Sequence, residues 1–329
     1  MNLTISSQNT ESTPTNGTGQ PLNQNCAPIL SLHFLIVILA LVGLAGNAIV
    51  LWLLGFRMRR NAISVYILNL ALADFLFLCC HIIDSLLRII DSYGLYAHNL
   101  SKEILNNGAI IPYMSGLSIL SAISTERCLS VLWPIWYHCH RPRNMSVIVC
   151  ALIWVLSLLM TIHSWYYTIF INGFQDVHKN LWKKADFIIT AYLIFLFVVL
   201  SGSSLALLVR ILCGSRRIPV TRLYATICLT VIVFLICGLP LGIYFFLLFW
   251  LGVHLHYPFC HTYRVTVVLS CVNCYANPTI YFFVGSFRKR RQHQSLKMVL
   301  QRALQDTPKE EGYTTSHLQE TMETSESKE

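Results

Sequence analysis

Residues 124–130 read Ser-Thr-Glu-Arg-Cys-Leu-Ser and lie at the end of a long apolar segment that begins near Ile104. A basic stretch follows them and runs to Arg143. An acid beside a base, Glu126 and Arg127, costs free energy at the end of a membrane-length segment unless the charges are paired or functional. In the simpler alternative, Arg127 anchors the helix end by extending to lipid head groups. The surrounding sequence decides between these two interpretations.

The composition is that of a membrane protein. The 329 residues are 55% hydrophobic and 12% charged, whereas soluble domains carry about 25% charged residues. A membrane-spanning helix needs about 20 apolar residues, and the apolar runs here are continuous rather than alternating, which favours helices over a barrel. We therefore predict an all-α bundle of seven transmembrane helices. The expected helices are 27–56, 63–90, 104–132, 146–171, 187–211, 223–253 and 266–287.

Basic residues indicate how the bundle is oriented. They gather after the first, third, fifth and seventh segments, for example at Arg59, Arg141, Arg217 and Arg290. Because cytoplasmic loops are enriched in Lys and Arg, the N-terminus is expected outside and the C-terminus inside the cell. The net charge of +9 is then explained by membrane faces, with no need for nucleic acid. The glycosylation motifs that fall on the outer side begin at Asn2, Asn16 and Asn99.

Four regions follow from this layout. Residues 1–26 read as a short glycosylated extracellular segment, and residues 27–287 as the transmembrane domain. Residues 288–304 are basic with an apolar stripe, which predicts an amphipathic helix on the lipids of the inner leaflet. Residues 305–329 are acidic and rich in Ser and Thr, which predicts a disordered tail that receptor kinases phosphorylate and arrestin binds.

Several polar residues interrupt the apolar segments. Asp74 would place a carboxylate near the middle of the membrane, and such a residue is a functional candidate by default. Its expected partners are Asn47, Asn273 and Asn277, which together with it form a cluster suited to a cation or a proton. The alternative for the asparagines alone is simple packing between helices.

The order and spacing of these residues resemble those of a rhodopsin-like G-protein-coupled receptor. The matching positions are Asn47, Asn69, Asp74, Glu126, Arg127, Trp154, Pro240, Asn277, Pro278 and Tyr281. Longer stretches at 61–70, 124–137, 210–215, 281–288 and 300–306 resemble the Mas-related receptors, in particular the X branch or a rodent relative. The resemblance implies that Glu126 holds Arg127 at rest, and that Arg127 turns to a heterotrimeric G protein on activation.

Some positions depart from the common receptor pattern. Lys102 stands where most such receptors have the helix-three cysteine of a disulfide, and Thr168 and Trp182 stand where Mas-related relatives carry a substitute bridge. The two cysteines expected outside the cell are Cys26 and Cys260. We predict that they form a disulfide between the N-terminus and the third outer loop.

The activation machinery also departs from that pattern. Gly238 replaces the usual tryptophan two residues before Pro240, and either leaves room there or lets the helix bend. Residues 219–224 contain no acid to hold Arg127 from helix six. Glu126 is therefore the expected local restraint, and we predict measurable basal signalling.

The resemblance implies a ligand site at the outer ends of the helices. Asp186 matches an acid that relatives use to bind cationic peptides and amines, although an acid at the start of a helix also stabilises that helix. Ser164 replaces the second acid of such a site, and Asp84 is the expected compensation. Trp165 and Tyr244 would stack on a cation, or else belong to an aromatic belt at the membrane interface.

We therefore expect a cell-surface receptor that senses a cationic peptide or small amine. The resemblance implies Gq, with Gi as the alternative, and a role in itch, pain or mast-cell signalling. Competing hypotheses are a receptor for a non-cationic small molecule or lipid, and a transporter that uses Asp74, although no internal repeat supports the latter. No paired catalytic carboxylates or metal-binding motif are found, so neither an enzyme nor a cofactor is expected.

Overall fold

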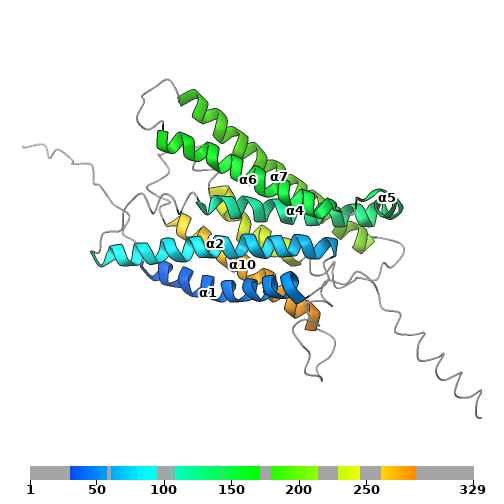
Figure 1. Ribbon diagram of the computed structural model, residues 1–329, viewed down its shortest axis with the longest axis horizontal. Coiled ribbons are helices and arrows are strands. Elements are labelled where there is room, and N and C mark those ends of the chain that lie inside the picture. The colour runs from blue at the N-terminus through cyan, green and yellow to red at the C-terminus, as the bar shows by residue number, and fades with distance from the viewer. Residues whose placement is uncertain are drawn as a thin grey trace, which may run out of the picture.

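The computed structural model describes a bundle of long helices, and its described residues contain no strand. The described residues are 30–57, 61–94, 105, 108–142, 144–170, 179–213, 229–244 and 261–286. The elements are α1 (Leu30–Trp52), η1 (Leu53–Arg57), α2 (Ala62–Ser92), α4 (Ile110–Leu132), α5 (Pro134–His140), α6 (Met145–Phe170), α7 (Lys179–Cys213), η2 (Phe234–Gly238) and α10 (Thr262–Ser286). Figure 1 shows the long helices running side by side, with α6 and α7 along one edge and α1 along the other.

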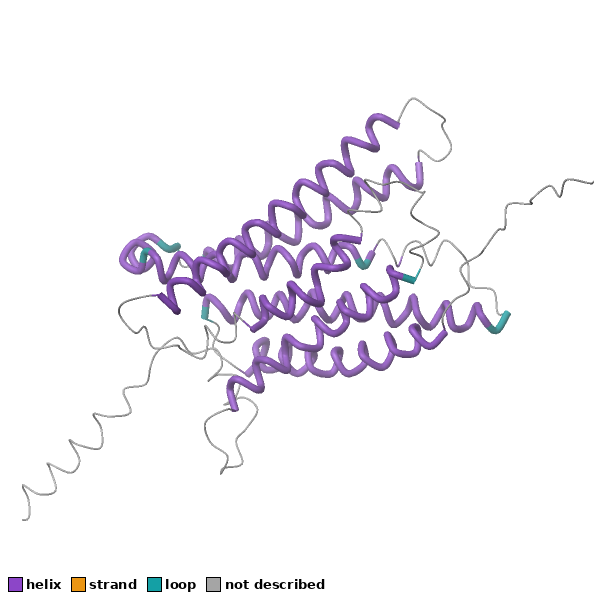
Figure 2. Tube along the Cα trace, turned by 180° about the vertical axis from the view of Figure 1, so that it is seen from behind, coloured by secondary structure: helices purple, strands orange, loops and turns teal. Residues whose placement is uncertain are grey.

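The contacts between helices place α4 in the middle of the bundle. It contacts α2, α6 and α7, whereas α1 packs on α2 and α10 (Figures 1 and 2). Among the described residues, three helical stretches are long and apolar enough to cross a membrane, namely Leu30–Arg57, Ala62–Ser92 and Met145–Ile162. Two shorter apolar stretches are Ala191–Ala206 and Leu229–Tyr244. α4 is less apolar because its serines, such as Ser115, Ser118 and Ser121, face other helices and not lipid.

Large apolar side chains cover the outside of the bundle, while small and polar residues lie between helices. Ile38 and Leu152 are more than half exposed, whereas Asn47 is buried. At Gly43 an added Cβ would lie 2.9 Å from Leu78 Cδ1, so a larger residue there would require the Leu78 side chain to move. Helices in lipid associate through such close contacts because lipid removes the hydrophobic drive between them.

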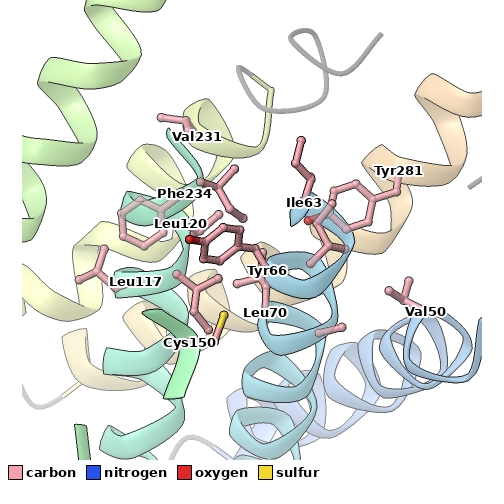
Figure 3. Packing of buried hydrophobic residues seen from close by; sticks show 14 of the residues in the cluster. Val50, Ile63, Tyr66, Leu70, Leu117, Leu120, Cys150, Val231, Phe234 and Tyr281 are labelled. Carbon is pink, nitrogen blue, oxygen red and sulfur yellow. The ribbon is translucent and has the colours of Figure 1, made fainter. Parts of the chain in front are cut away.

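An apolar cluster in one half of the bundle contains residues of α1, α2, α4, α6, α7, α10 and the helical stretch that includes η2. Figure 3 shows Tyr66 of α2 in the middle of the cluster, with Phe234 of η2 and Leu120 of α4 on one side and Tyr281 of α10 on the other. All four side chains are almost fully buried. The cluster therefore connects the helix that carries Glu126 to the helix that carries Pro240.

The basic stretch after α4 is more ordered than a loop. Residues 134–140 form α5, which begins with Pro134 in its first turn, where the missing N–H of proline costs no hydrogen bond. The sequence predicted no helix between residues 132 and 146, so α5 is an addition to the predicted helices. α5 matters because it brings Tyr137 and Arg141 back to the end of α4.

The sixth helical stretch widens just before Pro240. Within η2, the N–H of Leu239 donates to the carbonyl of Phe234, five residues earlier. The Phe234 ring fills the space beside Gly238, because a Cβ built there would lie 2.5 Å from Phe234 Cδ2. Tyr113 of α4 donates to the Gly238 carbonyl at 3.1 Å. Phe234, one turn earlier in the helix, thus occupies the space directly beside Gly238.

This packing predicts that Gly238→Ala destabilises the receptor. The added methyl forces the Phe234 ring to move, and overpacking of this kind costs about 1–3 kcal/mol. The matched control is Gly202→Ala on α7, where no atom lies within 4 Å of an added Cβ and alanine is worth about 0.5–1 kcal/mol over glycine in a helix. Thermal unfolding of the purified full-length variants measures both. A Gly238→Ala variant at least as stable as the unaltered protein would contradict the packing described here.

Candidate functional site

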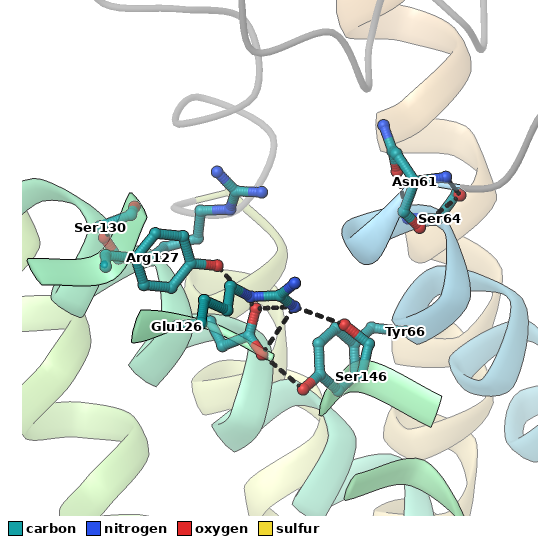
Figure 4. Close-up of polar contacts among 9 residues, drawn as sticks. Asn61, Ser64, Tyr66, Glu126, Arg127, Ser130 and Ser146 are labelled. Carbon is teal, nitrogen blue, oxygen red and sulfur yellow. Dashed lines mark hydrogen bonds and ion pairs between the residues drawn. The ribbon is translucent and has the colours of Figure 1, made fainter. Parts of the chain in front are cut away.

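Glu126 lies in the last two turns of α4 and is almost completely buried. Its carboxylate accepts four hydrogen bonds from three side chains (Figure 4). The Tyr66 hydroxyl donates to Oε1 at 2.7 Å, and the Tyr137 hydroxyl donates to Oε2 at 2.9 Å. Nη2 of Arg141 donates to both oxygens, at 3.1 and 2.9 Å. A buried carboxylate is tolerated only when it is paired and bonded in this way.

Arg141 connects the cluster to a further helix. Its Nη2 also donates to Ser146 Oγ at 2.6 Å, near the start of α6. Its guanidinium lies over the Tyr137 ring, 5.5 Å from the ring centroid. Tyr66 comes from α2, so four elements converge on the carboxylate of Glu126. We call Glu126, Tyr66, Tyr137 and Arg141 the Glu126 cluster.

The two partners from the α5 segment keep the protonation states that the cluster needs. Burial and the nearby Glu126 carboxylate raise the pKa of Tyr137 to about 12, so its hydroxyl stays a donor. Burial alone would lower the pKa of Arg141, but the Glu126 carboxylate raises it above its ordinary value. Near neutral pH these two partners are therefore a neutral phenol and a guanidinium cation, and both donate to Glu126.

The arrangement of Arg127 differs from the sequence-based expectation. Figure 4 shows its side chain extending away from the carboxylate of Glu126, which is occupied by Arg141 and the two tyrosines. Arg127 is also buried and makes contacts of its own. Glu126 was expected to hold Arg127. In the structure its carboxylate instead holds the α5 segment against α4. The partners Tyr66, Tyr137 and Arg141 were missed, since no spacing rule relates them to Glu126.

The polar residues in the middle of the bundle form two separate sets of bonds. Asn277 Nδ2 donates to Asp74 Oδ2 at 2.7 Å, as expected. Asn47 Nδ2 donates instead to the carbonyl oxygens of Gly43 and Cys274, at 2.9 and 3.1 Å, and so joins α1 to α10. The expectation that Asn47 pairs with Asp74 is therefore corrected.

A small cavity lies next to Asp74. Its volume is about 20 Å³, room for about one water molecule, and Asp74, Ser270 and Asn273 contribute polar groups to its wall. Within the described residues, Ser270 Oγ and Asn273 Oδ1 have no hydrogen-bond partner. The cation or proton predicted here from the sequence remains a prediction.

Other predicted activation residues occupy positions that couple helices. Trp154 Nε1 donates to Asn69 Oδ1 at 3.1 Å, which connects α6 to α2. Pro278 lies inside α10 against Gly46 of α1, where an added Cβ would be 3.0 Å from Pro278 Cγ. Tyr281 is buried in the apolar cluster of Figure 3.

At the opposite end of the bundle, Asp84 is buried and already bound by two arginines. Nε of Arg88 lies 2.9 and 3.0 Å from its two oxygens, and Nη1 of Arg264 lies 2.9 Å from Oδ2. Asp84 was predicted to be a second acid for a cationic ligand. Such a ligand would have to compete there with the two arginines that already bind the carboxylate. Tyr244 packs its ring on Tyr263, with centroids 5.4 Å apart.

The remaining predicted residues are described only in part. Asp186 lies within α7, and Ser164 and Trp165 lie within α6, but their side chains are outside the described part. The glycosylation motifs, the predicted disulfide, the amphipathic helix and the tail also lie outside it; these concern Asn2, Asn16, Asn99, Cys26, Cys260 and residues 288–329.

Comparison with known proteins identifies this arrangement. Residues 46–281 match the family model of the 7 transmembrane receptor (rhodopsin family). The chain is 73% identical to Mas-related G-protein coupled receptor member X1 of Mus musculus over 329 residues, covering 100% of both chains. It is 70% identical to the Rattus norvegicus protein of that name, covering 99% of both, and 56% identical to that of Homo sapiens, covering 93% of this chain and 92% of the relative.

The chain belongs to the Mas-related group of rhodopsin-family receptors. This confirms the family and the seven-helix fold inferred from the sequence. The family consists of receptors and not enzymes, so the chain is a multi-pass receptor of the plasma membrane with an extracellular ligand and G-protein partners.

The Glu126 cluster predicts a specific stability and pH profile. Tyr137→Phe removes one hydrogen bond to Glu126 and is expected to cost about 1 kcal/mol in unfolding free energy. Because the pKa of Tyr137 rises from 10.0 to about 12 on folding, this contribution is fully present below pH 10 and is lost as the pH rises through 12. Unfolding of the purified variant should therefore differ from the unaltered receptor by a constant amount between about pH 6 and about pH 9.

The control is Tyr93→Phe at the end of α2, where the side chain is 69% exposed and a change below about 0.5 kcal/mol is expected. A Tyr137→Phe effect no larger than that of Tyr93→Phe would show that the bond to Glu126 contributes nothing.

Proposed function

We propose that this receptor senses an extracellular cationic peptide or small amine and activates heterotrimeric G proteins of the Gq class, with Gi as the alternative. The N-terminus is placed outside the cell and the tail inside, where receptor kinases and arrestin act on residues 305–329. The basic segment 288–304 lies on anionic lipids of the inner leaflet. Sensory neurons and mast cells are the proposed settings, with itch and pain as the output.

The position of Asp186 carries the ligand proposal. α7 begins at Lys179, so Asp186 lies about two turns inside the helix and not in its first turn. The interaction of an acid with the helix dipole falls off within the first turn, so stabilisation of the helix start does not explain this residue. A carboxylate on a membrane helix near its outer end is then best explained by a cationic partner.

The ion pairs of Asp84 support a cation contact at Asp186 and not at Asp84. Asp84 already shares its carboxylate between Arg88 and Arg264, so a ligand ammonium group would meet two positive charges there. Asp186 on α7 is therefore the proposed contact, with Ser164 and Trp165 of α6 and Tyr244 completing the wall. A non-cationic small molecule or lipid is the second candidate, because Trp165 and Tyr244 are aromatic and would also pack on an uncharged ligand.

The inner end supports G-protein coupling through Arg127. Glu126 holds α5 and the start of α6 in place, and the apolar cluster connects α4 to the turn before Pro240. Movement of that turn would therefore reach the residues around Arg127. Asn277, Pro278 and Tyr281 on α10 are proposed to transmit the same movement through Asp74.

Calcium mobilisation in cells that express the full chain tests this proposal. A panel of short basic peptides and amines should raise calcium, whereas charge-reversed acidic peptides should not. Asp186→Asn should weaken the response at least about tenfold, since it removes a charge-assisted contact, and Asp186→Glu should retain most of it.

Surface expression of both variants is the control for folding. Selective inhibition of Gq and of Gi separates the two coupling classes. A response confined to neutral lipids, or one unaffected by Asp186→Asn, would refute the cationic ligand site.

A further inference from the structure

The outer end of the bundle contains a cluster of charges that the proposed cation contact does not use. Asp84 and Arg88 come from α2, and Arg264 comes from α10. Both guanidinium groups bond to the same carboxylate, at 2.9 Å each. We call these three residues the outer arginine cluster; it lies at the end of the bundle opposite Glu126.

The cluster has an excess of positive charge. Two guanidinium groups share one carboxylate, and within the described parts of α1, α2 and α10 the other acids are Asp74 and Asp91. Asp74 is ten residues away along α2, about 15 Å, and its carboxylate bonds to Asn277. Asp91 is exposed near the end of α2 and has an interaction of its own. Among these described residues, the cluster of Asp84, Arg88 and Arg264 therefore has one more positive than negative charge.

The donors of the two arginines are only partly used by Asp84. Arg88 contacts it through Nε, and Arg264 contacts it through Nη1. Each guanidinium has five N–H groups in a planar fork, so each retains N–H groups that Asp84 does not engage. The fork geometry suits a second carboxylate, which it binds with two parallel hydrogen bonds.

Two buried histidines beside the cluster also lack partners. His33 of α1 and His81 of α2 are 2% and 3% exposed, and Nδ1 of each has no hydrogen-bond partner within the described residues. Both imidazoles lie in the electrostatic field of Asp84, Arg88 and Arg264. Buried polar atoms are nearly always bonded in native proteins, so these atoms indicate that a further polar group belongs in this region.

The outer arginine cluster is partly exposed, so a ligand group could reach it from outside the bundle. The Arg88 side chain is 30% exposed, Arg264 13% and Asp84 3%. An incoming group would therefore meet Arg88 first and reach Arg264 next, without displacing Asp84. A purely structural ion pair between α2 and α10 would need one arginine, and the second one is left for another partner.

We propose that the outer arginine cluster is a binding subsite for a carboxylate group of an extracellular ligand. Arg88 and Arg264 hold the carboxylate, and Asp84 keeps the two guanidinium groups in register. The subsite does not depend on the cation contact proposed for Asp186. If both are correct, the ligand carries separated charges of both signs, as a basic peptide with a free C-terminal carboxylate does.

The test uses three small probes of the same shape and different charge: benzoate, benzamide and benzamidine. Thermal unfolding of the purified full-length receptor is measured with each probe at equal ionic strength, with sodium sulfate as a fourth condition. Benzoate at about ten times its dissociation constant should raise the unfolding temperature by about 2 °C or more. Benzamide, benzamidine and sulfate should give no comparable shift.

Two variants locate the effect. Arg88→Gln leaves Asp84 paired with Arg264 and removes the excess charge, so the benzoate shift should disappear. Arg88→Lys retains the charge but loses the fork, so part of the shift should remain. The comparison of the three probes on the unaltered receptor stands even if a variant folds poorly.

Four results would overturn the proposal. Stabilisation by benzamidine but not benzoate would make Asp84 a cation site, and equal shifts with benzoate and benzamide would show an aromatic pocket with no charge preference. An equal shift with sulfate would show a general anion effect. An unchanged benzoate shift in Arg88→Gln would place the carboxylate elsewhere. None of these measurements uses signalling, so their failure is distinct from failure of the proposed function.

Discussion

The inner half of this receptor depends on one buried carboxylate. Glu126 is removed from water, and its charge is tolerated because Tyr66, Tyr137 and Arg141 satisfy both of its oxygens. These partners come from α2, α5 and the residue after α5, and Arg141 continues to Ser146 of α6. A single buried charge therefore determines how four elements meet. Removing one partner would leave the others bonded to an under-compensated charge, which is costly in a low-dielectric interior.

The second constraint is steric and lies around Gly238. The Phe234 ring occupies the space that a side chain at 238 would need, and the Tyr113 hydroxyl holds the Gly238 carbonyl. Because Phe234 also belongs to the apolar cluster with Tyr66 and Leu120, a change in the turn before Pro240 cannot leave the end of α4 unaffected. The polar and steric constraints thus act on the same group of helices.

The sequence predicted the helices well because membrane-length apolar runs and basic loops have few alternative explanations. The Asp74–Asn277 bond followed from the need of a buried carboxylate for a partner, and the structure contains it. The partners of Glu126 were not predictable, since they depend on how a short helix after α4 folds back. Asn47 was assigned to the wrong partner because a backbone carbonyl of α10, which leaves no trace in sequence, satisfies it. The ion pair of Asp84 with Arg264 was missed because the two residues lie 180 positions apart in the chain. Its pair with Arg88 has the i,i+4 spacing of neighbours on a helix and could have been predicted.

We infer that Arg141 restrains the output end of α4 through Glu126. A double-mutant cycle on basal signalling tests it most directly, with Glu126→Gln, Arg141→Gln and the pair compared at equal surface expression. Either single change should raise second-messenger levels in the absence of ligand above those of the unaltered receptor. The pair should signal no more than the stronger single variant, because both changes break the same contact. Single variants that signal like the unaltered receptor, or effects that multiply in the pair, would contradict the claim.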